Sequence, residues 1–417
     1  MSIAPVVSSS LELRRRAVWP LRPGLVYLNH GSYGSCPAYV LERQDELRRR
    51  MEHDPTQFFK VDLEGLCDRA RDSLSQFINC QPQDLAFMPN GTVAVAVALH
   101  SVPLEPGDEV LVTDHEYSAT MNELERLCAW TGARVVKARI PVPVADENAV
   151  FEPIMAAVTP RTKLIVVSHI SSASGIIFPA RRLAHAARER GIEILLDGAH
   201  TPGQVTIDIA DLQPTFYAAS CHKWLGAPKG TGFLYVAREV QSRVRPLSLS
   251  CRTHLKRDDR AAFLCDFDYV GTNDYSANLV IPDAIEHLAS QVRGGWPEVM
   301  RLNHDKVMDA RALLCERTPV RPLAPERMIG SMASVALPPN PDPTRECDYD
   351  DPLQDALLKR HKIQVPVWDM APVADRVMRV SAQLYNTRQE YELLASALVE
   401  ELDRERGGEQ SPRYAGE

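Results

Sequence analysis

The chain has 417 residues, of which 45% are hydrophobic and 24% charged, the profile of an ordinary globular protein with room for two or three domains. A formal net charge of −8 and a pI near 5.9 argue against nucleic acid or an anionic membrane surface as a partner. No apolar stretch approaches the roughly 20 residues of a membrane span, the N-terminal charges follow the apolar part instead of preceding it as in a secretory signal, and the nine cysteines form no CxxC pair, so we expect a cytoplasmic protein with reduced thiols and no metal site.

In chain order, residues 1–20 predict an N-terminal arm, and strands and helices then alternate. Short apolar runs predict strands at 109–115, 134–140, 163–170, 192–200, 216–222 and 232–237. Several lack polar alternation, which is typical of strands covered on both faces. Helices are predicted at 118–132 and 179–191, the second opening with Pro179 and closing with Gly191. This alternation predicts an α/β large domain over residues 21–280, built on a mostly parallel sheet.

After residue 280 the pattern changes. Helical segments at 281–292, 351–362 and 387–406 are interleaved with few strand candidates, at 331–337, 364–368 and 375–382. This composition predicts a smaller α+β C-terminal domain over residues 281–404, followed by a flexible tail over 405–417.

Four polar clusters follow predicted strands of the large domain: "DHEYSAT", "SHISSASG", "DGAHTPGQ" and "SCHK". In open α/β sheets, ligands bind beyond the carboxyl ends of the strands, so the clusters predict one large site. The alternative for any single cluster is that strand ends are polar because loops are polar.

The residues at these strand ends suit an aldehyde cofactor. Asp197 ends an apolar run, where an unpaired carboxylate is costly, and a protonated pyridine nitrogen would balance its charge. Lys223 ends the next strand, where an aldehyde would consume its charge by forming an imine. Lys229 is a rival that we expect to face solvent, in a loop after a proline. His200 could bond a phenolic oxygen, although a structural histidine is the simpler interpretation. This set fits pyridoxal phosphate (PLP).

A phosphate needs hydrogen-bond donors. Asn90, Gly91 and Thr92 precede a helix-like segment, whose free N–H groups and dipole favour an anion. Further donors could come from Ser220 and His222, which are close to the lysine in sequence. A ring could also stack on Tyr117, although ordinary packing would explain that residue as well.

Six stretches together resemble the aminotransferase class V group of fold-type I PLP-dependent enzymes, above all its isopenicillin N epimerase-like branch. They are "LNHGSYG" (28–34), "PNGTVA" (89–94), "DGAHTPGQ" (197–204), "SCHKWLGAPKGTGFLYV" (220–236), "GTNDY" (271–275) and "MRVSAQLYNT" (378–387). The resemblance covers roughly residues 20 to 400. It implies a large domain with a seven-stranded, mostly parallel sheet, a smaller C-terminal domain, and a small amino-acid substrate.

The resemblance also implies a role for each matching position. Lys223 would form the Schiff base, Asp197 would pair with the pyridine nitrogen, and His200 would lie near the phenolic oxygen. The remaining cofactor-binding positions would be Gly91, Thr92, Ser220 and His222 for the phosphate, with Asn90 beside them and Tyr117 against the ring. Gly271 and Thr272 would reach the phosphate of the neighbouring subunit, which implies a homodimer with shared active sites. Arg379 would grip the substrate carboxylate, and Asn29 would line the substrate side.

The reaction stays open at this stage, because PLP stabilises a carbanion at the substrate Cα whichever bond breaks. We favour β-elimination or decarboxylative deamination of a cysteine S-conjugate in secondary, antibiotic-type metabolism. Epimerisation is an alternative, with Lys223 serving one face and Tyr117 a candidate for the other, and transamination is another. Cysteine desulfurase activity is disfavoured because Cys347, the only candidate thiol in the region upstream of Arg379, lies among carboxylates that raise its pKa. A catalytically idle binding protein is a further alternative, which the presence of Lys223 and Asp197 disfavours.

Overall fold

A seven-stranded sheet forms the centre of the larger domain in the computed structural model, which describes residues 18–253, 257–371 and 373–408. The strand order is β2-β8-β7-β6-β5-β3-β4, and only β8 runs antiparallel to its neighbours. The strands are β2 (Leu85–Met88), β3 (Glu109–Thr113), β4 (Arg134–Ala138), β5 (Thr162–Ser168), β6 (Glu193–Asp197), β7 (Phe216–Ser220) and β8 (Gly232–Val236). The α/β fold with a seven-stranded, mostly parallel sheet is therefore confirmed.

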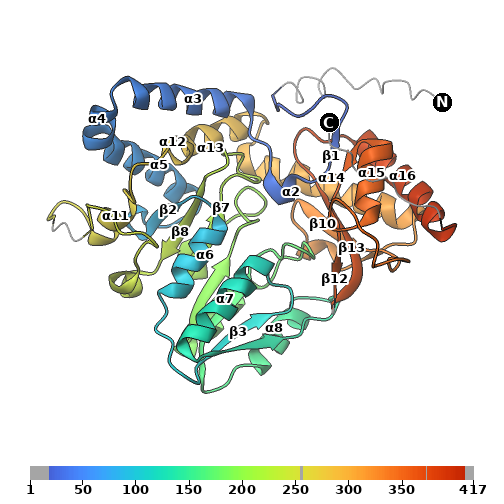
Figure 1. Cartoon of the computed structure of the whole chain (residues 1–417), viewed down its shortest axis with the longest axis horizontal. Helices are drawn as coiled ribbons and strands as arrows, with labels where there is room; N and C mark the ends of the chain where they lie inside the picture. Colours follow the sequence, from blue (N-terminus) through green and yellow to red (C-terminus); the bar gives the residue numbers. More distant parts are fainter. Residues whose placement is uncertain (1–17, 254–256, 372, 409–417) are drawn as a thin grey trace.

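Both faces of this sheet are buried, which explains its apolar strands. In β6, Ile194 and Leu196 point to one core cluster and Leu195 points to another. Helix α9 (Ala180–Glu189) covers the first side, and α6 (Gly91–His100) and α7 (Ser118–Thr131) cover the second. Figure 1 shows α6 and α7 in front of the sheet. Odd- and even-numbered positions along each strand must therefore both carry apolar side chains.

Five of the parallel strands end two or three residues earlier than predicted. The run 192–200, for example, stops as a strand at Asp197, and 109–115 stops at Thr113. The remaining residues leave the sheet as turns whose backbone groups bond elsewhere, as when Gly198 N–H donates to Ala218 O. These shortened ends place the polar clusters beyond the sheet edge. Strand β2 was not among the predicted strands, because its four residues "LAFM" are too short to show a period.

A smaller C-terminal domain carries a four-stranded antiparallel sheet of order β12-β13-β10-β9. Its strands are β9 (Arg321–Pro322), β10 (Met332–Ala336), β12 (Val367–Met370) and β13 (Ala374–Ser381). The helices α14 (Gly295–Arg317), α15 (Pro352–His361) and α16 (Arg388–Arg406) pack beside it, to the right in Figure 1.

The predicted strand 364–368 is divided in two. Its first part belongs to β11 (Ile363–Gln364), which pairs with β1 (Val26–Tyr27), and its second part to β12. Pro366 stands between them, and it has no N–H with which to continue a ladder. The N-terminal segment is thereby joined to the C-terminal domain.

The remaining helices pack around this frame. The boundary predicted at residue 280 stays a prediction, and α13 (Ile281–Ser290), which begins just after it, contacts α3 (Ala38–His53) and α5 (Leu63–Phe77) as well as α14. The other helices are α2 (His30–Tyr33), α4 (Pro55–Gln57), α8 (Asn148–Ala156), α10 (Ile209–Leu212), α11 (Ala262–Phe267) and α12 (Ser276–Leu279), with short 3₁₀- or π-helical segments at Phe58–Asp62, Pro82–Asp84, Arg238–Arg243 and Glu326–Met328.

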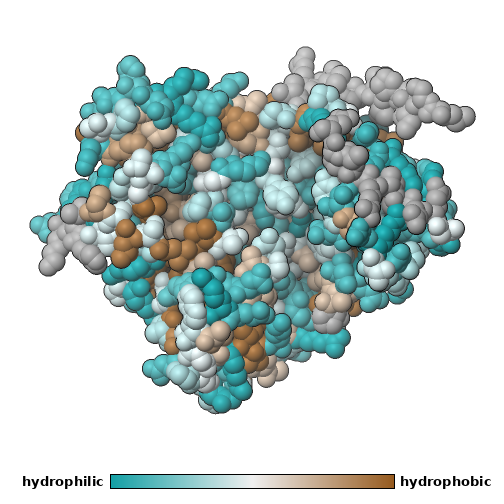
Figure 2. All heavy atoms as spheres, in the orientation of Figure 1, coloured by the Kyte–Doolittle hydropathy of each residue, from teal (hydrophilic) through white to brown (hydrophobic). Residues whose placement is uncertain are grey.

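Two surface properties bear on partners. In Figure 2 hydrophobic residues gather left of centre, beside α6, whereas α3 above them is mostly hydrophilic. None of the helices in the described part of the chain combines the length and the apolar composition that crossing a bilayer requires. Most of the predicted arm and of the predicted tail, residues 1–17 and 409–417, lies outside the described residues.

Candidate active site

Lys223, His200 and Asp197 lie together beyond the carboxyl ends of β6 and β7. Lys223 is buried, and its Nζ lies 3.0 Å from Nε2 of His200. Burial, helped by the nearby Arg379 guanidinium and opposed by Asp197, lowers the pKa of Lys223 to about 7. A buried amine that is half neutral near pH 7 is a nucleophile for an aldehyde.

Asp197 is the last residue of β6 and is almost completely buried. Burial raises its pKa, while the N–H of Ala199, which donates to Oδ1 at 3.0 Å, and the charge of Lys223 oppose the rise. Thr120 contributes a further side-chain hydrogen bond. A cation at this position would relieve the cost of burying the carboxylate, so the site fits the protonated pyridine nitrogen of PLP.

His200 is held neutral, because burial and the neighbouring cations lower its pKa well below the ordinary value. Its Nε2 faces Lys223, and its buried Nδ1 has no hydrogen-bond partner among the described residues. Gln204 fixes the backbone by donating from Nε2 to the carbonyl of His200 at 2.7 Å. An unpaired buried nitrogen beside the lysine suits a polar ligand at this place.

The residues predicted to bind the phosphate meet at the first turn of α6. Asn90 caps the helix, its Oδ1 accepting from the N–H of Val93 at 2.9 Å, and the N–H of Gly91 donates to Oγ of Ser220 at 3.0 Å. Thr92 is exposed on the same turn. His222 is neutral, because burial lowers its pKa to about 4, and its Nδ1 lies 3.3 Å from the carbonyl of Thr231. A ten-residue helix whose positive dipole end lies beside the hydroxyl of Ser220 can hold an anion.

Arg379, on β13, brings the smaller domain into the site. The side chain is buried and has no carboxylate partner among the described residues: Nη1 donates to the carbonyl of Ser172 at 2.6 Å and Nη2 donates to Oγ of Ser32 at 2.9 Å. Asn29 lies at the same guanidinium, with Oδ1 3.4 Å from Nη2. Nε has no hydrogen-bond partner among the described residues, and the guanidinium carbon lies 5.1 Å from the ring centroid of Trp368. A buried guanidinium balanced only by neutral groups favours an anionic ligand.

Three predicted residues, Tyr117, Gly271 and Thr272, are more exposed than the buried residues of this cluster. Tyr117 precedes α7 with 48% of its surface exposed, close enough to Arg379 to raise the pKa of that arginine slightly against the larger effect of burial. Thr272 is exposed and its hydroxyl lies 3.1 Å from that of Tyr269, whereas Gly271 is half-buried and its carbonyl accepts from Tyr275 at 2.7 Å. Their predicted role toward a neighbouring subunit stays a prediction.

Several site residues were not singled out from the sequence. Glu116 lies near Asp197 with one carboxyl oxygen accepting from Thr113 and the other from Ser168, both at 2.7 Å, and burial raises its pKa to about 7. Ser32, Ser172 and Trp368 surround Arg379. Glu116, Ser32 and Ser172 fall inside stretches already marked as polar clusters or family-like motifs, which was the available signal. Trp368 follows an apolar run and gave none.

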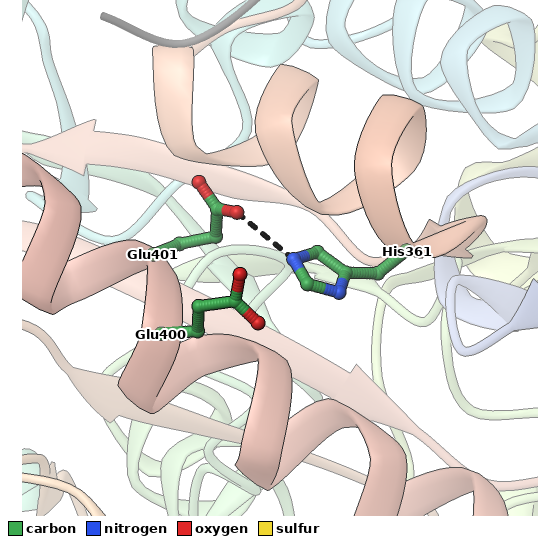
Figure 3. A group of neighbouring side chains, drawn as sticks. All are labelled: His361, Glu400 and Glu401. Atoms are coloured by element: carbon green, nitrogen blue, oxygen red, sulfur yellow. Dashed lines mark hydrogen bonds and ion pairs between the residues drawn. The ribbon is translucent and has the colours of Figure 1, made fainter. Parts of the chain in front are cut away.

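Two other groups were considered for chemistry. Burial and four neighbouring aspartates raise the pKa of Cys347, so its thiol is a poor nucleophile. His361, Glu400 and Glu401 bring three possible metal-ligating atoms within 4.8 Å of one another (Figure 3). Glu401 already accepts from Arg360 at 2.5 Å and from His361 at 2.9 Å, and Glu400 accepts from Arg404 at 2.7 Å. These bonds fasten α15 to α16 and explain the group as an ion-pair network.

Comparison with known proteins agrees with this geometry. Residues 27–290 match the family model described as aminotransferase class-V. Isopenicillin N epimerase of Amycolatopsis lactamdurans is 35% identical over 396 residues, covering 91% of this chain and 96% of that protein. An L-cysteine desulfhydrase of Arabidopsis thaliana is 26% identical over 410 residues, covering 90% of this chain and 88% of that protein.

Among solved structures, a mutant of C-DES with glycine covalently linked to its PLP cofactor matches with a TM-score of 0.78 and 19% identity, covering 92% of this chain and 98% of that one. That likeness confirms the fold. The family match spans more than half of the sequence, and the residues at the strand ends fit the ring, the phosphate and the aldehyde carbon of the cofactor. The chain belongs to the aminotransferase class-V family, and its cofactor is pyridoxal phosphate.

Proposed function

We propose that the protein cleaves the C–S bond of a cysteine S-conjugate by β-elimination, releasing a thiol, pyruvate and ammonia. The Cα proton leaves to a base, the C–S electron pair leaves with sulfur, and sulfur takes up a proton. Water then hydrolyses the remaining aminoacrylate to pyruvate and ammonium. We place this activity in secondary metabolism and in the cytoplasm, a location that the nine free cysteines support.

The observation that carries the proposal is the buried pairing of Lys223 with His200 and Asp197, facing Arg379. PLP, when bound, supplies the electron sink that stabilises negative charge at Cα. Lys223 Nζ, with a pKa of about 7, can accept a proton from Cα and return it. Arg379 would bind the substrate carboxylate and orient the bond to be broken.

The cofactor itself would be held by the strand-end residues. Asp197 would pair with the ring nitrogen, His200 would face the phenolic oxygen, and Tyr117 would cover the ring. Phosphate donors would be Gly91, Thr92, Ser220 and His222, with Asn90 capping the helix and with Gly271 and Thr272 of a second subunit completing the site. Asn29 would hold Arg379 in place from the substrate side.

C–S cleavage is supported by the likeness to L-cysteine desulfhydrase and by the high pKa of Cys347, which disfavours a desulfurase mechanism. Epimerisation is a second candidate, favoured by the 35% identity to isopenicillin N epimerase. It needs an acid or base on each face of Cα. Tyr117, close to Arg379, is the candidate for the face opposite Lys223.

The test is to incubate the PLP-loaded protein with an S-substituted cysteine and to measure pyruvate and free thiol. Equal amounts of both are expected. Exchange of Cα deuterium into solvent with neither product would contradict C–S cleavage and favour epimerisation. Carbon dioxide with an aldehyde would indicate decarboxylative deamination, and a keto acid with retained sulfur would indicate transamination. The matched control is Lys223→Ala, which should form no product.

The cofactor attachment has its own test. Borohydride reduction followed by peptide mass analysis should locate a pyridoxyl group on Lys223. An adduct on Lys229, or none at all, would contradict the assignment. Lys229 is exposed and its Nζ donates to the carbonyl of Gly34 at 3.0 Å, so it should stay unmodified.

A further inference from the structure

A buried histidine is hydrogen-bonded to the backbone of Lys223. His30 is the first residue of α2, and its side chain is fully buried. Its Nε2 lies 3.0 Å from the carbonyl oxygen of Lys223, and its Nδ1 lies 2.9 Å from the hydroxyl of Tyr385. The ring therefore joins the lysine segment of the larger domain to the smaller domain.

The two bonds define the state of the ring. Burial lowers the pKa of His30 to about 3, so the imidazole is neutral and carries one hydrogen. The carbonyl of Lys223 can only accept, so the hydrogen is on Nε2, and Nδ1 accepts from Tyr385. The amide nitrogen of Gln383 lies 3.3 Å from Nε2 of His30. Because both nitrogens are donors, this is a contact and not a hydrogen bond.

Aromatic packing holds the imidazole in this orientation. The ring of Trp224 lies edge-on at 5.4 Å and that of Trp19 at 5.9 Å, measured between centroids. Trp224, next to Lys223, donates from Nε1 to the carbonyl of Ala382 at 2.8 Å, a second link between the same two segments. The histidine cannot turn without disturbing these contacts.

The same short helix contacts Arg379. Ser32 of α2 accepts from the guanidinium, and the N–H of Gly31 donates to Oγ of Ser381 at 3.1 Å. At the end of α2, Gly34 approaches His222 so closely that a Cβ would lie 2.0 Å from the carbonyl oxygen of that residue. Figure 1 shows α2 between the seven-stranded sheet and the strands of the smaller domain.

We propose that His30 is a positioning residue. Its ring bonds the carbonyl of Lys223 on one side and the hydroxyl of Tyr385 on the other, and thereby fixes Lys223 relative to Arg379. The proposal rests on the proposed attachment of the cofactor to Lys223. It assigns His30 no contact with substrate or cofactor. A displaced lysine backbone would carry Nζ away from the place where the aldehyde and the substrate carbon are held.

Two amide substitutions separate this role from simple stability. The side-chain nitrogen of glutamine reaches about as far as Nε2, so His30→Gln keeps the bond to Lys223. The side-chain oxygen of asparagine reaches about as far as Nδ1 and can accept from Tyr385, so His30→Asn keeps only the bond to Tyr385. Each variant removes one of the two hydrogen bonds that the buried side chain makes, so the two should lose similar thermal stability. In both, the carbonyl of Lys223 keeps its bond from the N–H of Gly226, at 3.0 Å.

The measurement is the rate at which apo-protein and PLP form a borohydride-stable adduct on Lys223, together with kcat and KM. His30→Asn should slow adduct formation and lower kcat about tenfold, with little change in KM, while His30→Gln should stay within about twofold of the natural protein. If both variants lost adduct-formation rate and kcat equally, in proportion to their loss of thermal stability, the proposal would be overturned. If the natural protein formed no adduct on Lys223, the proposed function would fail instead, so the two failures are distinguishable.

Discussion

At the scale of single residues, the site depends on buried charges. Burial lowers the pKa of Lys223 and of Arg379, and the hydrogen-bonding neighbours given above for each are neutral. Asp197 acts on Lys223 as an opposite charge, and burial raises the pKa of this carboxylate as well. Ligands of complementary charge remove these costs when they bind, which couples cofactor and substrate affinity to the placement of a few side chains.

The reactivity of Lys223 should depend on pH. Only the neutral amine attacks an aldehyde, and its pKa of about 7 means that this form grows as pH rises toward 7. The rate of adduct formation by apo-protein with PLP should rise about tenfold per pH unit below pH 7 and level off above it. Rapid-mixing absorbance measures this rate. Asp197→Asn, which removes a carboxylate that raises the lysine pKa, should shift the midpoint to lower pH, and a midpoint near the ordinary lysine value would contradict the assignment.

Arg379 should determine carboxylate recognition. Replacing it with lysine keeps a charge but loses the planar fork, so Arg379→Lys should raise KM and reduce kcat/KM by about 100-fold, or about 3 kcal/mol. Steady-state kinetics with an S-substituted cysteine and with its carboxamide provide the measurement. The carboxamide should be used equally poorly by both proteins. An unchanged preference for the carboxylate in the variant would show that another residue binds it.

At the scale of elements, the helix α6 matters because its first turn, at the positive end of the helix dipole, is where the phosphate is proposed to bind. Asn90 satisfies the N–H of Val93, and Gly91 approaches β7 so closely that a Cβ would lie 3.0 Å from Oγ of Ser220 and 3.3 Å from Cβ of Ala199. A side chain at this position would push the helix start away from the end of the strand.

Gly91→Ala should therefore weaken the affinity for PLP by about tenfold, roughly 1.4 kcal/mol, without the stability gain that alanine normally brings to a helix. Gly65→Ala in α5 is the matched control, since the nearest atom to its Cβ would be 3.8 Å away in the flexible side chain of Arg69. That variant should gain about 0.5–1 kcal/mol. Equilibrium PLP binding and thermal unfolding check both. Equal PLP affinity in the two variants would argue against a phosphate at α6.

At the scale of the whole molecule, the two domains meet at the site. The pairing of β1 with β11 fastens the N-terminal segment to the smaller domain, and α2 follows directly after that strand. Lys223 and Asp197 come from the larger sheet, whereas Arg379 comes from β13. Folding of both parts is required before the amine and the guanidinium face one another.

A homodimer with shared sites makes a further prediction. If Thr272 serves the phosphate of the partner subunit, Thr272→Ala should bind PLP about 30-fold more weakly, or about 2 kcal/mol. Hybrids of Lys223→Ala and Thr272→Ala subunits should regain the natural affinity and activity at one site of two. Sedimentation confirms that hybrids form, and subunit-specific tags allow their isolation. If the hybrids bound PLP as weakly as the Thr272→Ala protein, Thr272 would belong to the site of its own subunit or to no site.

The sequence by itself determined the fold class, six of the seven strands of the large sheet and the cofactor. Strands buried on both faces must be apolar throughout, glycine and proline mark the helix ends, and the polar residues that follow each strand are local signals. The short β2 and the division of 364–368 at Pro366 were missed, because runs of two to five residues carry too little periodicity.

Only the tertiary structure decided which residues surround Lys223 and Arg379. His30, Glu116, Ser172 and Trp368 are separated in sequence by tens to hundreds of residues, and their roles arise from contacts between segments. Burial, which lowers the pKa of both Lys223 and Arg379, is likewise a property of the packed molecule. A sequence records which groups are present, whereas their desolvation and hydrogen-bond geometry exist only once the two domains have come together.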